Sequence, residues 1–174
     1  VRVPSFSATS ATINIAAGAT FDGNGTATLN QTTFDVAGAY SNGNMILNLN
    51  NVVMQGTGSF TNTGSVNMYD DDANPSRIEV PIVNQGSFLV RGLNNEFTSS
   101  SVTNAATGTL TVQTDNSSFA LDSRLALSNG LTNDGLIRMF DARTTCCSNP
   151  FLRISGGAGP IVNSVSGTIE DHVS

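Results

Sequence analysis

Residues 70–74 hold the densest group of side-chain oxygens in the chain. Asp70, Asp71 and Asp72 follow one another directly, and Asn74 comes two positions later. Carboxylate and amide oxygens held close together are the ligands that Ca²⁺ prefers in proteins. The segment matches neither the spacing of an EF-hand loop nor the glycine-rich nonapeptide of calcium-binding β-rolls. It predicts either a calcium site or a solvated acidic loop, and we expect no other cofactor.

The two cysteines, Cys146 and Cys147, are adjacent. Consecutive Cα atoms are about 3.8 Å apart, which is shorter than the usual span of a disulfide, so a vicinal bridge would require a strained peptide. Three states stay open: a vicinal disulfide, a bridge to another chain, and two thiols with no special role. Two cysteines are too few for a disulfide framework, so packing must hold the core.

The remaining composition argues against catalysis. The single histidine is His172, which removes most catalytic triads and histidine-based metal sites. Four aspartates lie at different offsets within the repeat described below and form no convergent pair for acid–base hydrolysis: Asp115, Asp122, Asp134 and Asp141. Arg77, Glu79 and Arg91 flank one region and predict a surface salt bridge. We therefore expect no catalytic residues and no enzymatic activity.

Length and charge restrict the class of protein. The 174 residues are enough for one domain, 1–174, with a sizeable core. Only 11% of the residues are charged, and the formal net charge is -6. A nucleic-acid-binding protein would carry a basic face, so we expect no nucleic-acid partner. No apolar run approaches the roughly 18 residues of a transmembrane helix, and we expect no transmembrane segment in this chain.

Apolar and polar residues alternate in short runs along most of the chain. Examples are residues 45–49, 65–68 and 109–112, which are rich in Val, Ile, Leu, Thr and Met. An alternation with a period of two is typical of half-buried β-strands. Glycine and asparagine interrupt every stretch long enough for a helix. The sequence therefore predicts an all-β fold.

An internal repeat gives these strands an order. Each unit has an apolar residue, any residue, an asparagine, a short spacer and a glycine, followed by apolar residues two and four positions later. The predicted corner residues are Asn42, Gly43, Asn62, Gly64, Asn84, Gly86, Asn104, Gly108, Asn133, Gly135, Asn163 and Gly167. The clearest repeats span 40–170, and residues 1–12 are predicted to be an N-terminal cap or linker. A period of about 20–30 residues is typical of a solenoid.

The repeat predicts a right-handed parallel β-helix in which each unit is strand, tight corner, strand. Stacking would form one interior column from Phe60, Ile82, Val102, Leu131 and Ile161. A second column would contain Val66, Phe88, Leu110, Ile137 and Ile169. Stacked asparagines can form a ladder of amide hydrogen bonds, and the longer repeats would carry loops near 115–124 and 141–150. The alternative is an antiparallel β-fold in which the Asn-Gly pairs mark hairpin turns.

The units Phe60–Val66 and Leu131–Ile137 resemble the "N-x-G-x-apolar" coils of bacterial autotransporter passenger domains and of filamentous-haemagglutinin-like exoproteins. Residues 15–21 are also similar to such a coil. The resemblance implies a surface-exposed or secreted protein of a Gram-negative bacterium, often an adhesin whose rod acts as a spacer. A phage or viral fibre β-helix is the nearest alternative.

From the repeat and this resemblance we expect a secreted or cell-surface structural protein that acts as a rod-like spacer or as the binding segment of an adhesin. Its partners would be a host or surface glycan or protein, or copies of itself. After Ile169, Asp171 occupies a column position that should be apolar, so a filament subunit that assembles head to tail through open coil ends is the second interpretation. A β-helical carbohydrate-active enzyme is the third.

Overall fold

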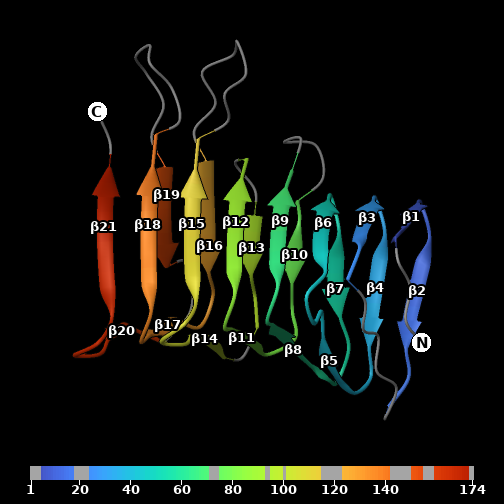
Figure 1. Cartoon of the computed structure of the whole chain (residues 1–174), viewed down its shortest axis with the longest axis horizontal. Helices are drawn as coiled ribbons and strands as arrows, with labels where there is room; N and C mark the ends of the chain where they lie inside the picture. The colour runs from blue at the N-terminus through green and yellow to red at the C-terminus, as the bar shows by residue number, and fades with distance from the viewer. Residues whose placement is uncertain are drawn as a thin grey trace.

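The chain winds into a right-handed coil of parallel β-strands. The structure, a computed structural model, describes residues 5–17, 24–70, 75–92, 95–99, 101–114, 123–141, 150–154 and 159–172. These residues form 21 strands and no helix. In Figure 1 the chain advances from right to left, with β18 running upward in front and β19 downward behind it, which makes the coil right-handed. The predicted parallel β-helix is confirmed.

Three parallel sheets form the sides of the coil. The first sheet has eight strands: β1 (Ser5–Thr9), β3 (Thr26–Asn30), β6 (Ile46–Asn50), β9 (Ser65–Tyr69), β12 (Ser87–Arg91), β15 (Thr109–Gln113), β18 (Leu136–Phe140) and β21 (Thr168–His172). The second has seven: β2 (Thr12–Ile15), β4 (Thr33–Val36), β7 (Val53–Gln55), β10 (Arg77–Ile78), β13 (Asn95–Phe97), β16 (Ser123–Leu127) and β19 (Pro150–Ile154). The third has six: β5 (Ala39–Ser41), β8 (Ser59–Asn62), β11 (Ile82–Asn84), β14 (Val102–Asn104), β17 (Leu131–Asn133) and β20 (Ile161–Asn163).

The predicted unit of strand, tight corner and strand accounts for two of the three strands in each full coil, and the third was not predicted. Each strand of the second sheet follows a strand of the first, from β1–β2 to β18–β19, and therefore lies between successive predicted units and not within one. Two predicted loops are also shorter than expected: Arg124 belongs to β16 and Pro150 begins β19. Residues 5–9, within the predicted cap or linker, form β1 and pair in parallel with β3.

Both predicted interior columns are present. Phe60 pairs in register with Ile82, which pairs with Val102, and Leu131 pairs with Ile161. The first-sheet column runs in register through Val66, Phe88, Leu110, Ile137 and Ile169. Strand side chains point alternately to the two faces, and β9, for example, alternates half-buried and buried residues along its length. Eight strands about 4.8 Å apart extend over about 34 Å along the coil axis.

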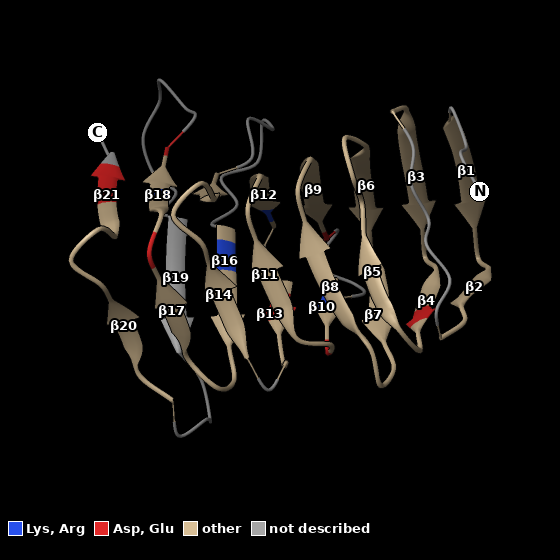
Figure 2. Cartoon of the chain, turned by 60° about the horizontal axis from the view of Figure 1, so that its bottom comes forward, with Lys and Arg blue, Asp and Glu red and all other residues tan. Residues whose placement is uncertain are grey.

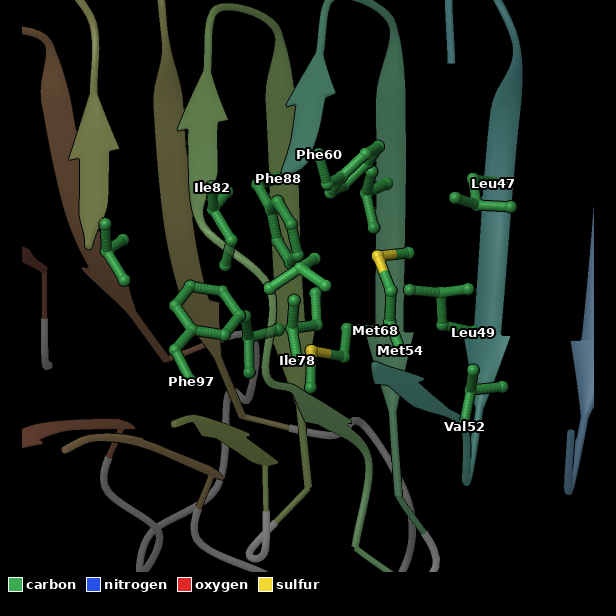
Figure 3. Packing of buried hydrophobic residues seen from close by; sticks show 14 of the residues in the cluster. Leu47, Leu49, Val52, Met54, Phe60, Met68, Ile78, Ile82, Phe88 and Phe97 are labelled. Carbon is green, nitrogen blue, oxygen red and sulfur yellow. The ribbon is translucent and has the colours of Figure 1, made fainter. Parts of the chain in front are cut away.

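The second sheet adds a third column to the core. Its register brings Phe34, Met54, Ile78, Phe97 and Leu127 into line, and all five side chains are almost completely buried. Figure 3 shows side chains from the three sheets meeting inside the coil. The ring of Phe88 meets that of Phe97 edge to face at 5.3 Å between centroids. Burial also raises the pKa of the Tyr40 phenol far above its usual value, so this side chain stays neutral inside the coil.

Candidate functional site

An asparagine ladder occupies the corner between the third and first sheets. It consists of Asn42, Asn62, Asn84, Asn104, Asn133 and Asn163. The Nδ2 of each of the first five asparagines donates to the Oδ1 of its equivalent in the next coil, and all five distances are 2.7 Å. The amide ladder expected from the repeat is therefore present in six successive coils.

A second set of bonds ties the ladder to the backbone. The Nδ2 of Asn62 also donates to the Ser87 carbonyl oxygen at 2.9 Å, and the Nδ2 of Asn104 donates to the Leu136 carbonyl oxygen at 3.0 Å. Both asparagines are almost completely buried. Because a buried amide without partners is costly, these bonds fix both the corner geometry and the register between coils.

The predicted glycines allow the coils to approach at this corner. A Cβ atom at any of five of them would meet a backbone carbonyl oxygen of the preceding coil: Gly64, Gly86, Gly108, Gly135 and Gly167. Gly43 differs because its φ is +55°, in the left-handed region that favours glycine. The close approach of the backbones of adjacent coils explains the repeat glycine, and at Gly108 and Gly167 the ladder asparagines also leave no room for a Cβ atom.

The described part of the acidic segment is a buried polar contact. Asp70 is 1% exposed, and its Oδ2 accepts a hydrogen bond from the Nδ2 of Asn95 at 2.9 Å. Asp71, Asp72 and Asn74 lie outside the described residues. Elsewhere in the described ranges no three His, Cys, Asp or Glu side chains gather as metal ligands. The calcium site stays a prediction, now with one of the Asp70 oxygens engaged inside the coil.

Calcium is expected to raise the melting temperature if residues 70–74 bind it, because a ligand that binds only the folded state stabilises it. At a free concentration of 100 times the Kd the gain is about 2.7 kcal/mol. Differential scanning calorimetry with Ca²⁺ or with a chelator measures the shift. The double variant Asp71→Asn, Asp72→Asn should remove it, and an unchanged melting temperature of the natural sequence contradicts the site.

The predicted cysteine pair is not tested by the described part of the structure. Cys146 and Cys147 lie outside the described residues, so a vicinal or intermolecular bridge stays a prediction. Intact mass before and after reduction distinguishes an oxidised pair from free thiols.

The predicted salt bridge involves two of the three residues named for it. The Arg77 guanidinium lies 3.8 Å from a Glu79 carboxylate oxygen and 3.0 Å from one of Glu96. Arg91 lies on β12 of the first sheet, in register with Tyr69, whereas Arg77 and Glu96 lie on the second. Including Arg91 in the salt bridge was wrong, because Arg91 and Arg77 lie on different sides of the coil.

Sequence reasoning also missed a groove on the outer face of the first sheet. Its volume is about 450 Å³, and its walls include Thr28, Asn48, Asn50, Asn67, Tyr69 and Arg91. A second groove of about 310 Å³ continues beyond Leu89, which both grooves share. The alternation of apolar and polar residues along β9 and β12 could have shown which side chains line this face, because residues between buried positions must face outward. Figure 2 shows how sparsely charged residues are distributed over the described strands.

Within the described residues no helix has the length and apolar character needed to cross a membrane. The fold of the chain is that of β-helix repeat proteins in general. In comparisons with known proteins, no protein-family model, no curated protein and no solved structure matches the chain.

Proposed function

We propose that this protein is an extracellular or cell-surface β-solenoid that acts as a rod-like spacer or as the binding segment of an adhesin. The observation that carries the proposal is the continuous asparagine ladder, which joins six successive coils with uniform 2.7 Å bonds. Buried networks in which every member has its partners stiffen and specify a fold. A coil bonded in this way along its axis suits a spacer that must keep its length.

Two features of the sequence support the proposed location and the absence of catalysis. The "N-x-G-x-apolar" units resemble those of autotransporter passenger domains, which are secreted or displayed on Gram-negative cells. The chain has one histidine and no lysine, so the side chain used most often in acid–base catalysis occurs only once. Antibody labelling of intact source cells tests the location: we expect staining without permeabilisation, and staining only after permeabilisation contradicts it.

The spacer function predicts a monomeric rod at all accessible concentrations. Size-exclusion chromatography with light scattering gives the mass, and small-angle X-ray scattering gives the longest dimension. We expect one chain per particle and an axial length of at least about 34 Å for the eight stacked strands. A compact particle without an elongated axis contradicts the proposal, and ordered fibres that grow with concentration favour the second candidate.

That second candidate is a self-assembling subunit of an extracellular filament or matrix. It is favoured by the last described coil, where Ile169 continues the interior column of Ile137 but is 44% exposed. An exposed apolar side chain beside an unpaired strand edge can pair with another chain. If fibres form, Ile169→Arg should abolish them without unfolding the coil, while the equally exposed but non-terminal Ile46→Arg should leave them intact.

A further inference from the structure

The outer groove of the first sheet is built from two rows of side chains that point away from the core. Register places Thr28, Asn48 and Asn67 in one row. Asn50, Tyr69 and Arg91 follow one another in the second. Adjacent members of a row come from adjacent coils, so the rows run along the coil axis. The groove therefore has room for an extended ligand lying parallel to the rod.

Hydrogen bonds between coils hold the amides of this groove in place. The Nδ2 of Asn67 donates to the Oδ1 of Asn48 at 2.8 Å, and the Nδ2 of Asn48 donates to the Oγ1 of Thr28 at 3.2 Å. The Nδ2 of Asn50 donates to the Oδ1 of Asn30 at 2.7 Å. An amide has two N–H donors and two oxygen lone pairs, so capacity remains for a ligand. Pre-ordered neutral donors and acceptors suit hydroxyl groups, because less side-chain entropy is lost on binding.

Arg91 gives the groove a single positive charge. Arg77 and Arg138 form salt bridges with glutamates, whereas no carboxylate pairs with Arg91 in the part of the chain that the structure describes. Its Nε is buried and has no hydrogen-bond partner there. A buried donor without an acceptor is unfavourable. If the Arg91 guanidinium rotates toward the groove, a ligand carboxylate can accept hydrogen bonds from both Nε and a terminal nitrogen. The Nε donor would then have its missing partner.

Tyr69 and the coil spacing narrow the class of ligand. Tyr69 lies beside Arg91 in register and lines the same groove, and its ring offers an apolar surface with a polar end. Coils about 4.8 Å apart match the length of one pyranose unit. The net charge of -6 disfavours a densely charged polyanion.

From these contacts we propose that the groove binds an oligosaccharide that carries isolated carboxylates, of the uronic- or sialic-acid type. One carboxylate pairs with Arg91, a sugar ring lies against Tyr69, and hydroxyl groups bond to the amides of Asn48, Asn50 and Asn67. The inference deepens the binding part of the proposed function and rests on it.

Isothermal titration calorimetry tests the site with three tetrasaccharides, which contain glucuronate, galacturonate or a terminal sialate. Each is compared with its carboxyl-reduced counterpart. We expect at least one acidic form to bind, and its reduced counterpart to bind at least 10-fold more weakly. Arg91→Gln should lower the affinity for the acidic form at least 10-fold and leave the affinity for the reduced form unchanged.

Arg77→Gln is the matched control, because this arginine lies on the second sheet and forms a salt bridge. It should bind as the natural sequence does, and circular dichroism should show all variants folded.

Failure of all three acidic sugars to bind, or equal binding by Arg91→Gln, overturns the proposal. Equal binding of a glutamate-containing tetrapeptide shows a general carboxylate site and overturns the saccharide assignment. Scattering on the same samples reports the rod separately, so a failed groove leaves the spacer function standing.

Discussion

Asn104→Ala is expected to lower the free energy of unfolding by about 3 kcal/mol, since each buried polar group left without its partner costs roughly 1–3 kcal/mol. The substitution removes the acceptor of the Asn84 Nδ2 and the donor to the Asn133 Oδ1. It also removes the bond to the Leu136 carbonyl oxygen. Because Asn104 is 1% exposed, water cannot easily replace these bonds.

Urea denaturation followed by circular dichroism measures this loss, and amide hydrogen exchange locates it. Coils of a solenoid contact mainly their neighbours, so exchange should accelerate most in β14 and β17. Asn48→Ala is the control: its amide also bonds between coils, but it lies on the outer face, where surface changes usually cost within about 0.5 kcal/mol. Equal losses for the two variants would show that the buried ladder contributes no more than a surface one.

Phe88→Ala is expected to cost about 3–5 kcal/mol, the usual range for removing a buried phenylalanine. The side chain is 1% exposed, lies in register with Val66 and Leu110, and meets the ring of Phe97. Removing it leaves a cavity between two sheets, because parallel strands bonded on both sides cannot close around it.

Phe140→Ala is the matched control for the Phe88 variant, because Phe140 lies on the same sheet but is 39% exposed. We expect a loss of less than about 1 kcal/mol for this surface position. Thermal and urea unfolding of the two variants give the comparison. A loss at Phe140 as large as that at Phe88 would contradict the assignment of the core to the inside of the coil.

The repeat predicted the corners and two of the three columns because their spacing is locked by hydrogen bonds. Asn62 and Gly64 must recur at nearly fixed offsets if the amides are to stack and the backbones are to touch. The second sheet has no such constraint. Phe34 comes eight positions before Asn42, whereas Ile78 comes six positions before Asn84, so the third column has no constant offset along the chain.

The groove could not be predicted for a related reason. Its walls come from four strands, and the pairing of Tyr69 with Arg91 depends on register between coils. Arg91 is closer in sequence to Glu79 than Arg77 is to Glu96, yet it is Arg77 and Glu96 that meet. Which charges pair is decided by the side of the coil on which each strand lies.

The asparagine ladder also makes the two ends of the rod chemically different. Within the ladder, each side-chain amide from Asn42 to Asn133 donates its N–H to the next coil toward the C-terminus, so the amide dipoles of the ladder add along the axis. At the last described coil, Asn163 presents an amide donor that turns to its own Gly167 carbonyl oxygen. A two-fold junction between identical ends would set donor against donor or oxygen against oxygen. The rod therefore has a polarity, and only a coil stacked in the same direction can continue it.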